Sequence, residues 1–131
     1  MKLTRLRRAT PTSDLRFKHP QRKIALPTTE GIYFEKVKEI VSLSAESNYT
    51  KIYKTNGRVI LVSKTLAEVE KMLHRHPNFV RVHRSFTVNL DLIVKYNRGK
   101  GGSVETETGS IIKVSAGRKQ GFLSAMQRYF G

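Results

Sequence analysis

YTKIYKTNGRVILVS, residues 49–63, carries the clearest structural signal in the chain. Two runs of β-branched and aromatic residues, 49–55 and 58–63, flank Asn56 and Gly57. An Asn-Gly pair between two such runs is a strong signal for a β-hairpin, because both positions tolerate the positive φ of a type I′ turn. We therefore expect an antiparallel hairpin here, closed by a type I′ turn.

Similar short runs continue on both sides of this hairpin. After Pro27, β-branched and aromatic segments are separated by turn residues at intervals of about ten, which is typical of an all-β domain. Turns are expected at the glycine-rich segment 98–102 and at Thr108-Gly109. The chain is therefore predicted to be mostly β. The further strands are expected at 31–34, 39–45, 79–83, 86–90, 92–97, 103–107 and 110–115.

One or two short helices accompany the strands. Thr65 and Glu68 have the spacing of a capping box, and apolar residues follow at helical intervals until Pro77 ends the run. A terminal helix is expected within 118–130, although Gly121 weakens it. The apolar face of this second helix consists of Phe122, Leu123, Met126 and Phe130.

The charge of the chain points to a polyanionic partner. Its 131 residues, enough for one domain, contain 25 Lys and Arg against 10 Asp and Glu, a formal net charge of +15. Nucleic acid is the first candidate and anionic lipid the second. A basic flexible arm is predicted over 1–22, followed by one folded domain over 23–131. The basic residues of the first 25 positions are Lys2, Arg5, Arg7, Arg8, Arg16, Lys18, Arg22 and Lys23.

The sequence argues against an enzyme, a metal site and a membrane segment. Cysteine is absent, and His74 and His76 are two positions apart, so they diverge around a helix and do not share a face. No nucleophile motif or Walker loop is present, so neither catalysis nor a cofactor is expected. No run of about 18 apolar residues occurs, so we expect no membrane insertion and a cytoplasmic location.

Three polar clusters are candidates for binding chemistry. In FVRVHRSF, 79–86, alternation places Val80 and Val82 on one side of a strand and the cationic residues Arg81 and His83 on the other. Ordinary turns and solvated surface remain alternative interpretations of all three clusters. The candidate contacts are Asn48, Tyr49, Thr50 and Lys51 in the first cluster, His83, Arg84 and Ser85 in the second, and Arg118 and Lys119 in the third.

Several of these motifs together resemble the LytTR DNA-binding domain of bacterial transcription regulators. The segments EIVSLSAESNYTKIY, VSKTLAEVEKML, VRVHRSFTVNLDLI and GSIIKVSAGR occur in the order and spacing of that family, over about Lys23 to Phe130. The resemblance implies an elongated, antiparallel multi-sheet β-fold whose loops enter successive major grooves of DNA. It assigns DNA contacts to the candidate residues named above. Ala116 and Gly117 stand where the family commonly has two basic residues, which leaves open which residue of that loop contacts DNA.

The resemblance also implies partners. Members act as homodimers or paired protomers on direct repeats in promoters, under a regulatory protein such as a sensor kinase system or a membrane inhibitor. Most members carry a receiver domain that the arm is too short to form, and Met1 favours a free-standing regulator over an excised fragment.

A small basic RNA-binding or ribosome-associated protein is the alternative function. Such proteins expose pairs of aromatic residues on strands to stack bases. Tyr53, Phe79, Phe86 and Phe122 instead lie in strongly apolar stretches that suit a core, which favours DNA binding. Attachment to a membrane surface would need a basic amphipathic helix, and the 65–76 segment carries too little positive charge for that.

Overall fold

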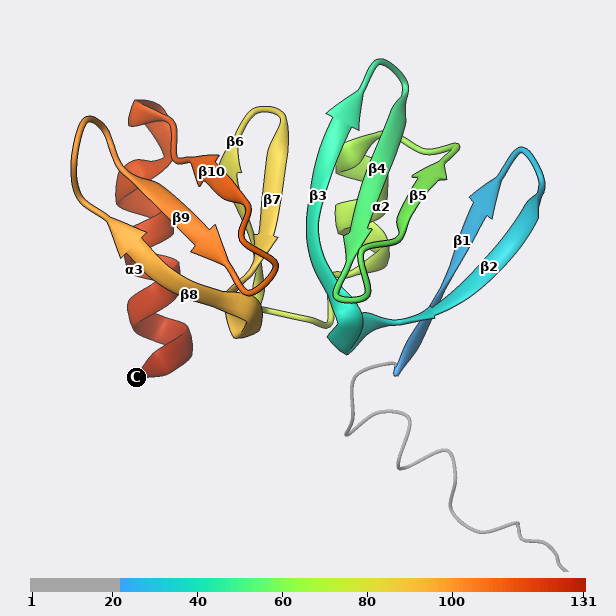
Figure 1. Cartoon of the computed structure of the whole chain (residues 1–131), viewed down its shortest axis with the longest axis horizontal. Coiled ribbons are helices and arrows are strands. Elements are labelled where there is room, and N and C mark those ends of the chain that lie inside the picture. Colours follow the sequence, from blue (N-terminus) through green and yellow to red (C-terminus); the bar gives the residue numbers. More distant parts are fainter. Residues whose placement is uncertain (1–21) are drawn as a thin grey trace, which may run out of the picture.

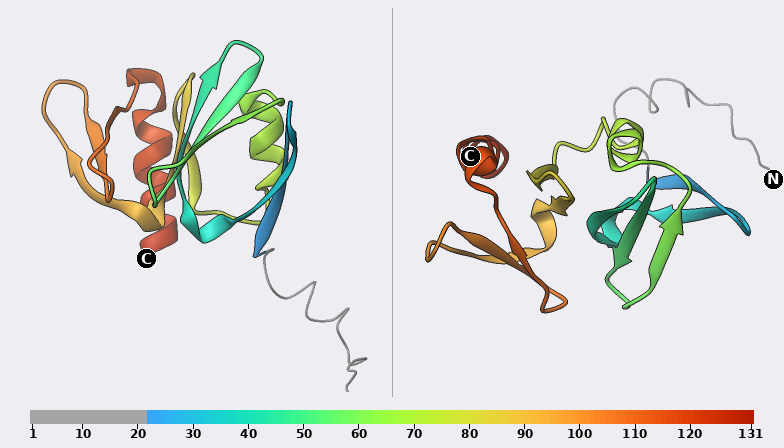
Figure 2. Two further views of the ribbon diagram at one scale, coloured as in Figure 1. Left: turned by 45° about the vertical axis from the view of Figure 1, so that its right-hand side comes forward. Right: turned by 90° about the horizontal axis from the view of Figure 1, so that it is seen from above.

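The computed structural model describes residues 22–131, which form three antiparallel sheets and two short helices along one elongated body (Figures 1 and 2). The predicted mostly β, multi-sheet fold is confirmed. The basic arm expected over 1–22 falls, apart from Arg22, outside the described residues. The strands are β1 (Lys23–Thr28), β2 (Gly31–Lys36), β3 (Ile40–Glu46), β4 (Tyr49–Lys54), β5 (Val59–Val62), β6 (Phe79–His83), β7 (Phe86–Asn89), β8 (Ile93–Asn97), β9 (Ser103–Thr106) and β10 (Ile111–Lys113).

The helices connect and cover the sheets. The α-helices are α2 (Leu66–Met72) and α3 (Lys119–Phe130), and the short 3-10 turns are η2 (Val37–Glu39), η3 (Leu90–Leu92) and η4 (Ala116–Arg118). A central sheet has the strand order β5-β4-β3-β7-β6, while β1-β2 forms a separate hairpin and β10-β9-β8 a third sheet. In Figure 2, the view from above places α3 near one end of the molecule and the β1-β2 hairpin at the other.

The β4-β5 hairpin is confirmed, but its predicted type I′ turn is wrong. Gly57 has φ +87°, whereas Asn56 is not among the described non-glycine residues with positive φ. The Gly57 N–H donates to the Lys54 carbonyl at 3.0 Å and the Lys54 N–H to the Arg58 carbonyl at 2.9 Å. This is a three-residue loop with a single left-handed glycine. The Asn56 side chain stabilises it by accepting the Arg58 N–H at 2.9 Å.

The hydrophobic core has two parts, one at each end of the central sheet. The first lies between the β1-β2 hairpin, strands β3 to β5 and α2, and the second between β6, β7, β9, β10 and α3. The predicted capping box of α2 is confirmed. Phe122 is buried as predicted, but Phe130 is 62% exposed, so its assignment to the buried face is wrong. Tyr129 packs there instead, and its hydroxyl donates to Asp91 at 2.7 Å.

The buried Asn89 links the two halves of the molecule. Its Nδ2 donates to the Ile40 carbonyl at 2.8 Å, and its Oδ1 accepts from Asn78 Nδ2 at 2.7 Å and from the Asp91 N–H at 2.9 Å. Each bond reaches a different segment of the chain. Because every hydrogen-bonding atom of this amide has a partner, Asn89 fixes the two cores relative to each other without an unsatisfied polar group.

The first strand begins earlier than predicted. Strands are expected from the sequence only after Pro27, whereas Pro27 lies within β1. Proline cannot donate a ladder hydrogen bond, so it is tolerated where its strand needs no donor. The Pro27 carbonyl accepts the Ser63 N–H at 2.8 Å, on the side of β1 that faces away from β2. An ion pair between the buried Lys54 and Glu35 also fastens β2 to β4.

Candidate nucleic-acid interface

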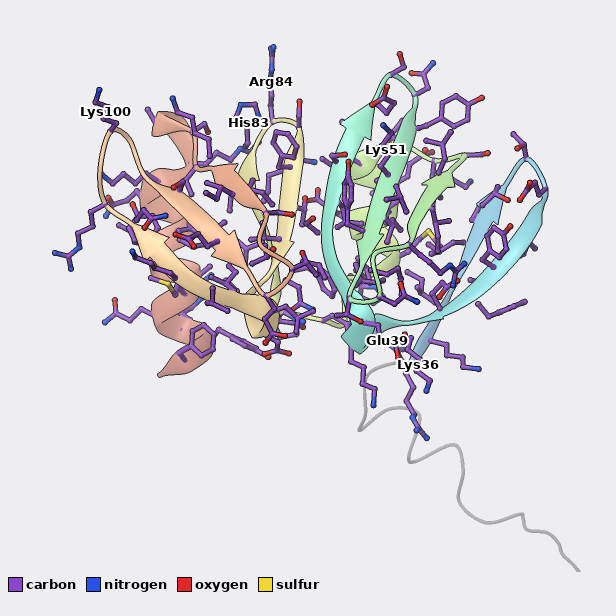
Figure 3. All side chains as sticks on the ribbon, in the orientation of Figure 1. Lys36, Glu39, Lys51, His83, Arg84 and Lys100 are labelled. Carbon is purple, nitrogen blue, oxygen red and sulfur yellow. The ribbon has the colours of Figure 1, made fainter. Side chains whose placement is uncertain are left out.

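Three connections that carry the candidate residues, and a fourth that carries Arg98 and Lys100, lie on one long edge of the molecule (Figures 1 and 3). They are the β3-β4 turn, the β6-β7 turn, the β8-β9 connection and the connection from β10 to α3. We call this surface the loop edge and define it as residues 46–51, 83–85, 98–102 and 115–119. The β4-β5 and β9-β10 turns lie on the opposite edge, as do the labelled Lys36 and Glu39.

Arg84 is an exposed residue of the β6-β7 turn, and its backbone is held from behind by Arg81. Arg81 Nη1 donates to the Arg84 carbonyl at 3.0 Å, while Nε and Nη2 donate to Glu70 of α2 at 2.9 and 2.7 Å. Figure 3 shows the Arg84 side chain projecting away from the protein. The guanidinium of Arg81 therefore supports the turn, whereas that of Arg84 faces solvent.

Arg81 lies on the face of β6 opposite the buried Val82, as the alternation predicted, but it is bound to the protein and does not project freely into solvent. Its side chain is 20% exposed, because Glu70 reaches this side of β6 from α2 and pairs with it. Burial raises the pKa of Glu70, but the hydrogen bonds from Arg81 and Thr87 outweigh it, so the pKa lies below its usual range. Sequence analysis missed Glu70. The signal was its position between Leu66 and Leu73 on the buried stripe of the helix, where a carboxylate requires a partner.

The other two residues of the turn are tied to the same framework. The Ser85 N–H donates to His83 Nδ1 at 3.1 Å, so a neutral His83 ring carries its proton on Nε2, where it can donate to a ligand. The Ser85 carbonyl accepts the Ala45 N–H at 2.8 Å, which ties the β6-β7 turn to β3. His83 also packs against Phe86 with a centroid distance of 5.4 Å.

The β3-β4 turn presents three of its four candidates at the surface. Asn48 is exposed and Tyr49 is 39% exposed, next to Ser47 with φ +54°. Lys51 is paired with Glu46 at 3.6 Å across the hairpin. Thr50 is a correction to the predicted set, because its side chain is fully buried and its hydroxyl donates to the Lys64 carbonyl at 2.8 Å. The two-residue period of β4 places it on the core side with Ile52.

Arg118 and Lys119 lie where η4 passes into α3, and both are exposed. The Ser115 N–H donates to the Val82 carbonyl at 2.8 Å, which ties this connection to β6. The 12-residue helix α3 begins at the loop edge, with neither an acidic residue in its first turn nor a side-chain cap. The positive end of its dipole therefore adds to the positive charge of this edge.

The sequence reasoning treated the glycine-rich segment 98–102 only as a turn, but the structure places it on the loop edge. Arg98 and Lys100 are exposed there, and Lys100 points outward in Figure 3. Among the described residues, neither has an acidic side chain within ion-pair distance. The signal was available in the sequence, because Arg98 and Lys100 flank Gly99 without an acidic neighbour.

The arrangement favours contact with a duplex over stacking of single-stranded bases. Tyr53, Phe79 and Phe86 are half-buried and Phe122 is buried, so these aromatic residues form no exposed platform. Residues 22–131 contain no group of three or more histidine or acidic side chains arranged to hold a metal ion. None of the helices described is long and apolar enough to cross a membrane.

Comparison with known proteins gives one consistent result. Residues 30–127 match the sequence profile of the family described as the LytTr DNA-binding domain. The chain is 38% identical over 73 residues to the sensory transduction protein LytT of Bacillus subtilis, which covers 56% of this chain but 30% of that protein. It is also similar to the LytTr DNA-binding domain of a putative methyl-accepting/DNA response regulator from Bacillus cereus. That match has a TM-score of 0.70 and 22% identity and covers 81% of this chain and 97% of the other.

Proposed function

Because the chain belongs to the LytTR DNA-binding domain family, we propose that it regulates transcription by binding double-stranded DNA at direct repeats in promoters. The observation that carries this proposal is the loop edge, where basic residues from four separate connections face one side of the molecule. Connections on a rigid β-framework can enter successive major grooves along one side of a duplex.

The residues of the loop edge have different roles in this proposal. Arg84 pairs with a guanine edge, because its side chain is exposed while its backbone is fixed by Arg81. Asn48 reads a second base from the β3-β4 turn. Lys100, Arg118 and Lys119 neutralise phosphates, and the beginning of α3 presents N–H groups to the phosphate backbone.

Two protomers bound to neighbouring repeats would follow one another along the duplex in the same orientation. The arm at 1–22 follows phosphates or an adjacent minor groove, which its basic composition supports. A regulatory protein controls occupancy of the site. The chain spans 30% of the length of LytT from Bacillus subtilis, so this partner is assigned only as a class.

A selection from random duplexes tests the proposal. The wild-type chain should enrich a direct-repeat motif, and Arg84→Ala should lose about 1 to 3 kcal/mol of binding to that motif but little on random DNA. Arg128→Ala is the matched control, because it removes the same charge from the last turn of α3. Enrichment of structured RNA in a parallel selection, or no motif at all, would contradict the proposal. Equal losses on both DNA types would make Arg84 a phosphate contact.

A further inference from the structure

A pocket lies on the side of the molecule away from the loop edge. Its volume is about 510 Å³, which is within the range that holds small organic ligands. Three parts of the chain form its walls: the open end of the β1-β2 hairpin with η2, the connection from α2 to β6, and η3 with the last turn of α3. Lys36, one of the lining residues, is labelled on that side in Figure 3. The pocket therefore shares no residue with the loop edge.

Positive charge gathers at the hairpin end of this pocket. Lys23 lies directly opposite Lys36 in the β1-β2 ladder, an arrangement that mutual repulsion disfavours. The Arg22 carbonyl accepts the Val37 N–H at 2.9 Å, which fixes Arg22 beside the two lysines. The fold thus holds several like charges together at one end of the pocket. The exposed cations of the lining are Arg22, Lys23, Lys36 and Lys38.

These four cations have no acidic partner. In the part of the chain that the structure describes, none of them forms an ion pair. The acidic residues nearest to them in sequence, Glu35 and Glu39, are bound by the buried Lys54 instead. Asp91 is the one acid among the described lining residues, and it accepts the Tyr129 hydroxyl at 2.7 Å on the wall formed by η3 and α3. An anion bound at the hairpin end would therefore relieve a repulsion that the folded chain leaves uncompensated.

The remaining walls of the pocket are apolar or neutral. Val37, Pro77 and the ring of Tyr129 give it apolar surface. His76 lies beside Pro77, and burial lowers its pKa, so its ring is neutral at pH 7. A hollow with cations at one end and apolar side chains along the rest suits a molecule with both characters. The sugar-phosphate backbone of a duplex has no apolar body to fill such a hollow.

We propose that this pocket binds a small organic anion, in which a carboxylate, sulfonate or phosphate group is attached to an apolar ring or short alkyl chain. The anionic group lies among the cations of the hairpin end, where lysine and arginine donate charge-assisted hydrogen bonds. The apolar body packs on Val37, Pro77 and Tyr129, away from water. Because the pocket and the loop edge lie on opposite sides, the ligand and DNA bind at the same time. The site does not rest on the proposed function.

A fluorescence titration of the full chain with anilinonaphthalene sulfonate tests the site, because this probe is an aromatic ring system with one sulfonate. Saturable binding of one probe per chain is expected. The double variant Lys36→Gln, Lys38→Gln should bind it about tenfold more weakly, because two attractive charges are lost. Lys95→Gln, Lys113→Gln is the matched control, which removes the same charge from exposed positions of the third sheet and should leave the affinity unchanged.

Two further probes separate the two parts of the proposed ligand. Phenylnaphthylamine has the same ring system without the sulfonate, and inorganic sulfate has the charge without the rings. Each should bind at least about tenfold more weakly than the complete probe if charge and apolar contact both contribute. Equal binding of phenylnaphthylamine would mean that the cations are not involved and would refute the proposal.

Amide signals in nuclear magnetic resonance locate the bound probe. Val37, Asn78 and Asp91 represent the three walls, and the signals of all three should shift on addition of anilinonaphthalene sulfonate. Those of Arg84 and Lys100 on the loop edge should not. Shifts on the loop edge without shifts at the walls would place the probe elsewhere and overturn the assignment.

Four other results would also overturn the site: no saturable binding to wild type, equal weakening in both double variants, displacement of the probe by duplex DNA, or hexaglutamate binding as tightly as the probe. The last result would mean that the cations hold an acidic protein segment and not a small ligand. Thermal melts identify any variant that has lost its fold. Failure of the proposed function would appear as a chain that does not bind duplex DNA but gives an unchanged probe titration, so the two failures are distinguishable.

Discussion

Removing Arg81 tests whether the fold holds the β6-β7 turn through a partly buried ion pair. Arg81→Ala removes two hydrogen bonds to Glu70 and one to the Arg84 carbonyl. Hydrogen bonds to charged groups contribute about 1.5 to 3 kcal/mol each. Both side chains keep some solvent access, at 20% and 28% exposed, and Glu70 keeps its bond from Thr87, so we expect a loss of about 3 kcal/mol in unfolding free energy.

That loss corresponds to a measurable shift in thermal stability. A domain of about 110 residues has an unfolding entropy of about 0.23 kcal/mol/K, so the midpoint should fall by about 13 °C in a circular-dichroism melt. Arg84→Ala is the matched control, because it removes the same group from an exposed position and should shift the midpoint by less than about 2 °C. If the midpoint of Arg81→Ala falls by less than about 4 °C, Arg81 does not hold the turn in the way proposed.

The pH dependence of this difference gives an independent check. The folded chain lowers the pKa of Glu70, because the bonds from Arg81 and Thr87 outweigh the opposing effect of burial. A lowered carboxyl pKa contributes stability above the unfolded value of about 4.3, and this contribution disappears as pH falls through the folded pKa. The stability gap between wild type and Arg81→Ala should therefore narrow below about pH 4. A gap that stays constant to pH 2 would show that the charge of Glu70 is not involved.

Four further changes have defined outcomes. Asn89→Ala should lower the unfolding free energy in urea by about 3 kcal/mol, because two buried hydrogen bonds and one part-buried hydrogen bond are lost, and a change below 1 kcal/mol would contradict the linking role. Glu46→Gln should strengthen DNA binding in fluorescence anisotropy by about 0.5 to 1 kcal/mol by freeing Lys51, and weaker binding would oppose a DNA-facing turn. Burial lowers the pKa of His76, and the charge of a neighbouring histidine lowers it further. The thermal stability of the wild type should therefore fall on acidification below about pH 6.5, and that of His76→Gln should fall less. Equal dependence of the two melting temperatures on pH would refute this. Deleting 1–22 should reduce the salt dependence of affinity by several charges without changing site preference, and an unchanged slope would exclude the arm from binding.

The fold could be predicted from local patterns because most of its elements are locally specified. The Asn-Gly hairpin and the capping box at Thr65 formed where expected. The type of turn was wrong because the Asn56 side chain bonds the backbone, and a pair of residue types does not indicate that bond. Pro27 was taken as a boundary because the sequence does not show which side of a strand lacks a donor. The register of β1 against β2, together with the hydrogen bond from the Ser63 N–H to the Pro27 carbonyl, decides this.

The candidate site was predicted less completely, since it depends on contacts between distant segments. The exposure of turn residues such as Asn48 and Arg84 could be predicted, because polar groups at strand ends are commonly exposed. Thr50 was misassigned although the period of β4 indicates its burial. The pairing of Glu70 with Arg81 joins a helix to a strand, and Lys100 reaches the loop edge only through the order of the third sheet. Neither follows from a local pattern.

The hydrogen bond from Arg81 to the β6-β7 turn has a consequence for how the sequence of this protein can change in evolution. Arg81 holds the carbonyl of residue 84, not its side chain, and every amino acid has that carbonyl. The side chain at this position contributes almost nothing to folding, so it can be exchanged without loss of stability. Under the proposed role of Arg84 as a base contact, single substitutions at position 84 would change the preferred DNA sequence, while Arg81 and Glu70 are retained to keep the turn in place. The side chain proposed to read DNA and the side chains that hold the turn would then be neighbouring but separate residues, which would make position 84 a point for redesign.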